Sequence, residues 1–285
     1  MIDPQMRSLY LDWPHEVSIE TFAKCNAACT FCPYTTLDRI GTKMPDEMID
    51  RIIEELKDHP WPFMIAPFKV NEPFLDKRLI PICRRINEEI PKAHLRIFTN
   101  GSALTGKHMD EVATLERVVH LWCSLNEHEP EAYKELMGLD FERTCANLDL
   151  LHERVLQNIF PHPVVISKVR ECNETPTSRD KAFSEFVHSR WPLFSVTLIK
   201  RDGWLGYTEP GDATVPQAPC GRWYELSICA DGKVSLCCMD GKAEFAIGDL
   251  NKQSLFEVYN SRFYRERRVK SLNRQGISPC ERCTY

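Results

Sequence analysis

The stretch "VSIETFAKCNAACTFCPYTTL", residues 17–37, governs the interpretation of the whole chain. A strand-like run leads into a loop that carries three cysteines, Cys25, Cys29 and Cys32. Their spacing lets three thiols converge on one metal centre. A structural zinc site and an ordinary iron–sulfur cluster each take four protein ligands. Because no fourth cysteine lies nearby, one metal position stays open for a substrate or cofactor.

Strand-like and helix-like segments alternate around this loop through the first 200 residues. The predicted strands cover residues 17–22, 64–70, 94–100, 118–126, 164–172 and 194–200. The predicted helices cover residues 45–58, 76–90, 106–115, 141–155 and 178–190. Six such repeats predict an α/β fold, a partial (β/α)6 TIM-like barrel with a parallel sheet. The chemistry of such barrels lies at the C-terminal ends of the strands, where the three-cysteine loop begins.

The chain changes character after residue 200. Residues 201–219 are rich in glycine and proline and predict a linker or lid. Two short strands around the turn at residues 230–232 and a helix over residues 254–272 are predicted beyond it. We therefore expect a barrel over residues 1–200, the linker or lid, and a small cysteine-rich domain over residues 220–285.

Composition excludes several classes of protein. The 285 residues carry a net charge of −5 without a dense Lys/Arg face, which argues against a nucleic-acid partner. No apolar run reaches the roughly 18–20 residues of a membrane span, and the N-terminus lacks a signal pattern. We therefore expect a cytoplasmic protein with reduced thiols. The thirteen cysteines are clustered, which favours metal or cluster ligation over disulfides.

The three-cysteine loop resembles a known signature. Cys25-x3-Cys29-x2-Cys32, with Phe31 before the last cysteine, resembles the motif of radical S-adenosylmethionine (SAM) enzymes. The resemblance implies a [4Fe–4S] cluster held by three cysteines, with SAM bound at the open iron. It also implies cleavage of SAM to a 5′-deoxyadenosyl radical that abstracts a hydrogen atom from a substrate. The protein would position and shield that chemistry.

Other segments fit the same resemblance as SAM-binding positions. "KVNEPFLD" resembles the family's Gly-Gly-Glu-Pro segment, with Val70 and Asn71 in place of the two glycines. The alternation of side chains along strands places Lys168, Arg170 and Cys172 on one face, which we expect to be the ligand-facing wall. The positions that the resemblance implies for SAM binding are Phe31, Asn71, Glu72, Thr99, Asn100, Ser124, Asn126 and Arg170.

The C-terminal cysteines resemble the SPASM domain and its shorter "twitch" form, which bind auxiliary clusters in radical SAM enzymes. The resemblance implies one auxiliary [4Fe–4S] cluster with the ligands Cys220, Cys237, Cys280 and Cys283. Neighbouring residues on a strand end point opposite ways, so one of Cys237 and Cys238 is expected to bind. Cys238 or Cys229 remains open as the completing ligand instead of Cys237.

A thiol left over beside this site has two interpretations. Cys238 is either a buried small hydrophobic residue, the usual state of a free cysteine, or a hydrogen-atom donor to a substrate radical. Cys172 is the second candidate donor. A donor thiol favours epimerisation of a small polar substrate, such as a sugar, an aminocyclitol or another natural product.

Alternatives to epimerisation remain open at this point. One is dehydrogenation, with the auxiliary cluster as electron acceptor, and another is modification of a ribosomally made peptide. The resemblance also implies a reductase partner such as flavodoxin or ferredoxin. An alternative of another class is a non-catalytic zinc-binding interaction protein.

Overall fold

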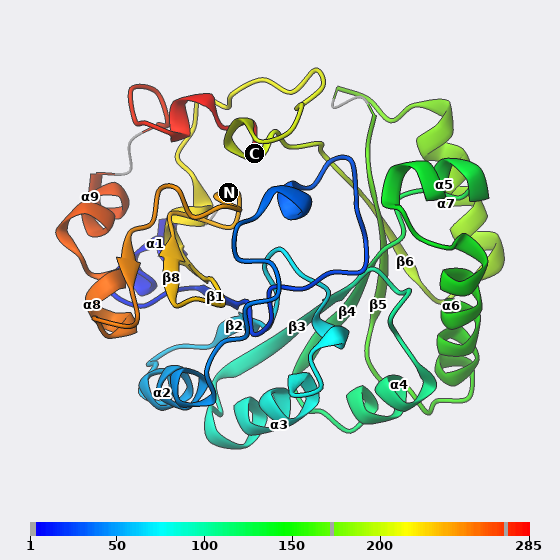
Figure 1. Ribbon diagram of the computed structural model, residues 1–285, viewed down its shortest axis with the longest axis horizontal. Helices are drawn as coiled ribbons and strands as arrows, with labels where there is room; N and C mark the ends of the chain where they lie inside the picture. The colour runs from blue at the N-terminus through cyan, green and yellow to red at the C-terminus, as the bar shows by residue number, and fades with distance from the viewer. Residues whose placement is uncertain (1–3, 172–173, 271–272) are drawn as a thin grey trace.

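A computed structural model describes residues 4–171, 174–270 and 273–285 of the chain. Its strands form one sheet in the order β6-β5-β4-β3-β2-β1-β7-β8-β9 (Figure 1). The strands are β1 (Glu16–Ile19), β2 (Phe63–Ala66), β3 (Ala93–Thr99), β4 (Val118–Ser124), β5 (Val164–Val169), β6 (Ser195–Ile199), β7 (Glu225–Ile228), β8 (Lys233–Ser235) and β9 (Gly248–Asp249). The first six pair in parallel, each with its neighbour in the sequence. The partial barrel predicted from the sequence is therefore confirmed.

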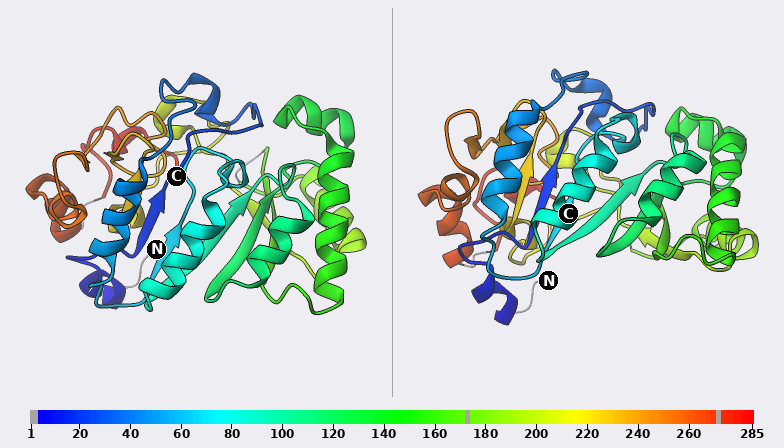
Figure 2. Two further views of the ribbon diagram at one scale, coloured as in Figure 1. Left: turned by 60° about the horizontal axis from the view of Figure 1, so that its bottom comes forward. Right: turned by 90° about the horizontal axis from the view of Figure 1, so that it is seen from below.

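Helices cover the outer face of the curved sheet (Figure 2). The helices of the described residues are α1 (Pro4–Leu9), α2 (Asp46–Leu56), α3 (Leu79–Glu89), α4 (Gly106–Ala113), α5 (Pro130–Met137), α6 (Phe141–Leu156), α7 (Ser178–Arg190), α8 (Leu255–Tyr259) and α9 (Arg262–Lys270). In α2 the buried residues Met48, Ile52 and Leu56 recur at helical spacing. This spacing turns one apolar stripe of the helix toward the strands.

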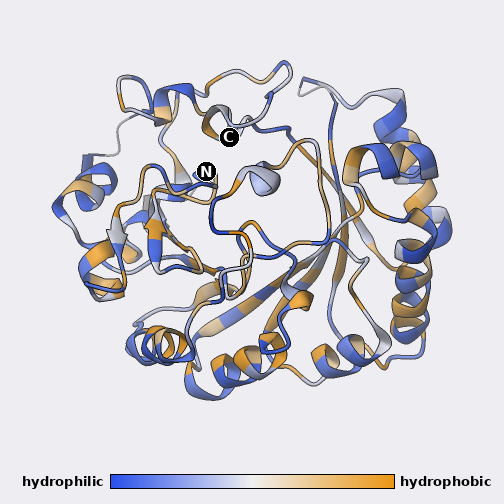
Figure 3. Ribbon diagram, in the orientation of Figure 1, coloured by the Kyte–Doolittle hydropathy of each residue, from blue (hydrophilic) through white to orange (hydrophobic). Residues whose placement is uncertain are grey.

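The two faces of the sheet have different partners. Along β3, Leu95 and Ile97 are fully buried toward the helices, whereas Arg96 and Phe98 alternate with them on the concave face. Figure 3 shows this alternation of hydrophilic and hydrophobic residues along the strands. The core therefore lies between the sheet and the helices, and the concave face is left for a ligand.

Several element boundaries differ from the prediction. β2 ends at Ala66 because Pro67 cannot donate a hydrogen bond to the next strand. The helix predicted over residues 254–272 is two helices, α8 and α9, separated at Asn260 and Ser261. The helix α5 was not predicted. The predicted ends at residues 172 and 271–272 lie outside the described residues.

The C-terminal region continues the sheet of the barrel. β7 pairs in parallel with β1, in the register Glu16 to Glu225. β7 and β8 form the predicted antiparallel hairpin, and Gly232 adopts a positive φ of 86° in its turn. Within the described ranges, none of the helices combines the length and the apolar character needed to cross a membrane.

Candidate active site

A cavity of about 880 Å³ lies between the concave face of the sheet and the C-terminal region. The three-cysteine loop lines one part of it, and Cys238 and Tyr285 of the C-terminal region line another. We call this space the main cavity. It lies between the three-cysteine loop and the Cys238 thiol of the C-terminal region.

Cys25, Cys29 and Cys32 all line the main cavity. The backbone of their loop is held against the end of α5, because Ala28 donates to the Met137 carbonyl at 2.9 Å. Asn100, which follows β3, donates to Asn26 at 2.8 Å and lies 3.9 Å from the Cys25 sulfur. The loop is thus fixed by contacts from two separate elements.

Burial makes these three thiols poor thiolates on their own. Loss of contact with water raises the pKa of Cys25 to about 12 and that of Cys32 to about 11. It also raises the pKa of Cys29 well above its ordinary value. A bound cationic metal centre reverses this preference and keeps a coordinating thiol deprotonated. Three half-buried thiols with no compensating side-chain cation among their described contacts fit an iron–sulfur cluster.

The loops after β2 and β3 contribute the next predicted positions. Glu72 is 2% exposed and accepts hydrogen bonds from the Thr99 hydroxyl at 2.9 Å and the Asn100 backbone at 2.7 Å. Burial raises the pKa of Glu72 to about 7. Because both of its oxygens are occupied, Glu72 joins the two loops and acts first as a positioning residue.

Asn71 offers a hydrogen-bond donor to the main cavity. Its Oδ1 accepts from the Lys69 backbone at 2.9 Å. Its Nδ2 is buried and has no partner among the described residues, although the residue lines the cavity. A buried donor of this kind normally has a partner, so a ligand such as SAM fits here.

The other predicted SAM-binding positions are Phe31, Ser124, Asn126 and Arg170. Phe31, Ser124 and Asn126 line the main cavity. Asn126 uses its side chain for structure, since its Oδ1 accepts from the Val169 backbone at 3.0 Å. Its φ of 65° lies in the left-handed region, which asparagine tolerates better than most residues.

The predicted facing of β5 was wrong. Trp122 and Ser124 pair in register with Val165 and Ser167, so these four residues share the concave face. Val169, not Lys168 or Arg170, lines the main cavity. Lys168 turns the other way, where its Nζ donates to the Asn126 carbonyl at 3.0 Å. The length and charge of the Lys168 side chain suggested a ligand-facing position. A buried lysine can instead find hydrogen-bond partners for its ammonium group within the protein.

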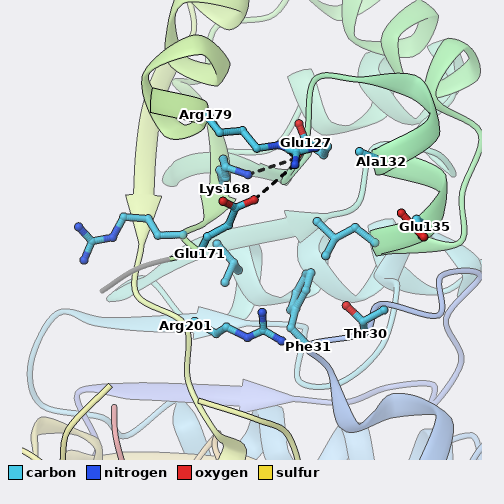
Figure 4. Close-up of a pocket in the computed structure, with 12 residues that line it drawn as sticks. Thr30, Phe31, Glu127, Ala132, Glu135, Lys168, Glu171, Arg179 and Arg201 are labelled. Atoms are coloured by element: carbon cyan, nitrogen blue, oxygen red, sulfur yellow. Dashed lines mark hydrogen bonds and ion pairs between the residues drawn. The ribbon is translucent and has the colours of Figure 1, made fainter. Parts of the chain in front are cut away.

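Arg170 lines a smaller neighbouring cavity of about 220 Å³. Glu127 lines the same cavity (Figure 4) and lies 2.9 Å from Arg179 and 3.4 Å from Lys168. Phe31 lines both cavities. A contact from Arg170 to SAM stays a prediction.

The four predicted auxiliary ligands come together in the C-terminal region. Cys220, Cys237, Cys280 and Cys283 are each 6–8% exposed. Burial raises the pKa of each of these four thiols, and the nearby thiols of the same group reinforce the shift. Cys229 instead lies near Lys69 and Arg39. This arrangement supports Cys237 over Cys229 as the fourth member of the group.

Cys238 turns away from that group. It is half-buried and lines the main cavity, near Arg222. Cys237 and Cys238 lie in a bend and a turn after β8, so the strand alternation from which their opposite facing was predicted does not explain it. The second predicted donor, Cys172, lies outside the described residues.

In the part of the chain that the structure describes, no three His, Cys, Asp or Glu side chains group closely enough to hold one ion. The C-terminal group supplies the four thiols that an ordinary [4Fe–4S] cluster takes, and the three-cysteine loop supplies three.

Sequence reasoning missed several residues of the main cavity. They are Glu16, Lys69, Phe68, Arg96, Phe98, Arg222 and Tyr285. Arg96 and Phe98 share the concave face with Trp122, which the alternation along β3 would have indicated. Nothing in the sequence pattern brings Arg222 or Tyr285 to the barrel, because that contact depends on the pairing of β7 with β1.

Comparison with protein families defines the class. Residues 19–167, slightly more than half of the chain, match the radical SAM superfamily, and residues 220–284 match an iron-sulfur cluster-binding domain, SPASM. The chain belongs to the radical SAM superfamily. It is therefore an enzyme, and its cofactors are [4Fe–4S] clusters and SAM.

A curated relative is the S-adenosyl-L-methionine-dependent 2-deoxy-scyllo-inosamine dehydrogenase of Niallia circulans. The two are 27% identical over 131 residues, 45% of this chain and 52% of the relative. The matched part thus spans about half the length of that relative.

Two solved structures share the fold. BtrN in complex with AdoMet and 2-DOIA has a TM-score of 0.64 and 15% identity, covering 95% of this chain and 93% of that one. Streptococcus suis SuiB bound to precursor peptide SuiA has a TM-score of 0.69 and 16% identity, covering 96% and 70%.

Proposed function

We propose that the enzyme removes a hydrogen atom from a small polar ring substrate in the main cavity and returns one from Cys238, producing an epimer. One observation carries this proposal. A single cavity is lined by the three-cysteine loop and by the Cys238 thiol. Abstraction and return from different sides of a carbon invert its configuration.

The cofactor site is proposed from the residues that line the cavity. Cys25, Cys29 and Cys32 would hold the SAM-binding cluster, and the Asn71 amide would donate to SAM. Thr99, Asn100, Ser124 and Asn126 would shape the remainder of that site, and Glu72 would hold its two loops together. When bound, the reduced cluster and SAM supply the 5′-deoxyadenosyl radical that abstracts the hydrogen atom.

At Cys238 a hydrogen atom moves from sulfur to the substrate carbon. The substrate carbon, having lost a hydrogen atom, takes the hydrogen atom of the Cys238 S–H bond. A new C–H bond forms, the S–H bond breaks, and a thiyl radical is left on Cys238. One electron from an external reductase, such as flavodoxin or ferredoxin, and one proton from solvent restore the thiol.

Dehydrogenation is the second candidate, and the name of the Niallia circulans relative favours it. The substrate radical would then lose a second electron and its hydroxyl proton to give a carbonyl. Cys220, Cys237, Cys280 and Cys283 would hold an electron-accepting cluster for that outcome. Peptide modification draws support from the shared fold with SuiB, which is bound to a precursor peptide in its structure.

Deuterium labelling separates epimerisation from dehydrogenation. Reconstituted, reduced enzyme is given SAM and a panel of inositols, aminocyclitols and sugar acids in deuterated buffer. Epimerisation predicts a product one mass unit heavier, because the Cys238 thiol exchanges with solvent, and Cys238→Ala should lose that product. Cys83→Ala, which removes a fully buried thiol of α3, is the matched control.

Two outcomes would count against the donor role. One is a product that Cys238→Ala still forms without solvent deuterium at the reacting carbon. The other is a product lighter by two hydrogens, which is the result of dehydrogenation.

We propose a cytoplasmic location because of the state of the thiols. All of the described cysteines are free. A thiol-rich chain with two oxygen-sensitive clusters suits a reducing cytoplasm.

A further inference from the structure

Lys69 is a buried lysine in the main cavity that has no acidic partner among the described residues. It is 3% exposed, and the one hydrogen bond of its Nζ to the residues that the structure describes goes to the Asp240 carbonyl, at 3.0 Å. No carboxylate of the described residues lies within 4.0 Å of it. An ammonium group has three donors, and a buried charge is costly unless it is paired. The remaining N–H donors of the Lys69 ammonium group therefore favour binding of an anion in the cavity.

The neighbouring charges do not supply that anion. Glu16 is paired with Arg96 at 2.6 Å. Glu72 is held by Thr99 and Asn100, and Asp202 lies near Arg222, Arg274 and Lys200. Five cationic side chains line the main cavity, against three acidic ones. Arg96 and Arg222 are already paired, with Glu16 at 2.6 Å and Glu225 at 2.9 Å, whereas Lys69 has no carboxylate within 4.0 Å among the described residues. The cavity-lining cations are Lys69, Arg96, Lys200, Arg201 and Arg222.

The place of Lys69 points to the substrate end of the cavity. Lys69 and Cys238 both line the main cavity, and the Lys69 Nζ donates to the carbonyl of Asp240, two residues after Cys238. This hydrogen bond holds the ammonium group in place before a ligand arrives. An anion bound by Lys69 would lie close to the thiol that is proposed to act on the substrate.

We propose that Lys69 binds an anionic oxygen group of the substrate, a carboxylate or a phosphate, beside Cys238. This inference rests on the proposal that a small polar ring occupies the main cavity. It makes the substrate a ring acid or ring phosphate. A ring that carries only an amine, such as an inosamine, would place a cation against Lys69 and be disfavoured.

Binding by four matched rings tests the inference without radical chemistry. Reconstituted enzyme with SAM is titrated with glucuronate, glucose 6-phosphate, glucose and glucosamine at equal ionic strength. Ligand-induced stabilisation of the folded state is read as the rise in thermal midpoint. We expect at least one anionic ring to stabilise the enzyme more than glucose, and glucosamine to stabilise it no more than glucose. Whichever of glucuronate and glucose 6-phosphate stabilises the enzyme more shows whether the site prefers a carboxylate or a phosphate.

Variants of Lys69 show whether this side chain causes the preference for an anionic ring. Lys69→Met should weaken binding of the preferred anion about tenfold, as expected for loss of a charged hydrogen bond, and leave glucose unchanged. Lys69→Arg keeps the charge and should keep the preference. The control Lys233→Met removes an exposed lysine that is paired with Asp231 at 3.6 Å, and should change nothing.

The inference is wrong if neither anionic ring exceeds glucose, if glucosamine binds most tightly, or if Lys69→Met keeps the anion preference. The comparison of the four rings on wild-type enzyme decides the matter even where a variant does not fold. Failure here leaves SAM cleavage and deuterium transfer intact, so it is distinguishable from failure of the proposed function.

Discussion

A buried ion pair ties the three-cysteine loop to the C-terminal region, and its loss should destabilise the enzyme strongly. Glu20, directly after β1, is fully buried, and Arg39 is 8% exposed. Two hydrogen bonds, of 2.5 and 3.0 Å, join them. Glu20 also accepts from the Ala230 backbone at 3.1 Å, and Arg39 donates to the Gly241 carbonyl at 2.7 Å.

Arg39→Met removes the cation and leaves the Glu20 carboxylate buried. Breaking a buried pair in this way costs about 3–5 kcal/mol of the free energy of unfolding. With a urea dependence of about 3 kcal/mol per molar, the unfolding midpoint should fall by about 1 M or more. The double variant Glu20→Leu/Arg39→Met, which leaves no unpaired charge, should recover part of that loss.

The assay is anaerobic urea unfolding of the reconstituted enzyme, followed by tryptophan fluorescence. Arg85→Met is the matched control, because Arg85 is 38% exposed where it pairs with Asp50 and Glu89. An exposed pair of this kind contributes up to about 1 kcal/mol. A loss below about 1 kcal/mol for Arg39→Met, or a double variant no more stable than the single one, would refute the reasoning.

Two further predictions concern the concave face and a tight turn. Burial, assisted by Arg96, lowers the pKa of His120 to about 4 from an ordinary 6.5, so only the unfolded chain gains this proton as the pH falls through that window. As the pH falls from about 6.5 to 4, the urea midpoint of His120→Phe should therefore rise relative to that of wild type. A difference between the two midpoints that does not change with pH would contradict this. Gly101→Ala adds a Cβ at 2.8 Å from the Cys123 sulfur at a φ of 78°, whereas Gly41→Ala, at a φ of 86°, meets nothing within 4 Å. The thermal midpoint should fall more for Gly101→Ala, and equal losses would show that the contact with Cys123 does not matter.

The barrel was predictable because each strand and helix carries its own local pattern. Alternation in "HLRIFTN" and the helical spacing of Met48, Ile52 and Leu56 are features of single segments. The boundaries were less predictable where one residue decides them. Pro67 ends β2 earlier than its apolar character indicates.

The site was predictable where residues are close in sequence, and not where the fold brings them together. The three-cysteine loop and the hairpin around Gly232 are local. Lys69 and Asp240 are 171 residues apart, and Glu20 and Ala230 are 210 apart, so no spacing rule reveals them. The facing of β5 failed for a related reason, since it depends on the register with β4.

The most direct test of the account compares wild-type enzyme with the triple variant Cys25→Ala/Cys29→Ala/Cys32→Ala after anaerobic reconstitution. Wild type should hold about eight irons per chain and, when reduced with SAM, release 5′-deoxyadenosine. The triple variant should keep about four irons, in the C-terminal group, and release none. Wild-type enzyme that releases no 5′-deoxyadenosine, or a triple variant that still does, would contradict the central claim that this loop holds the SAM-binding cluster.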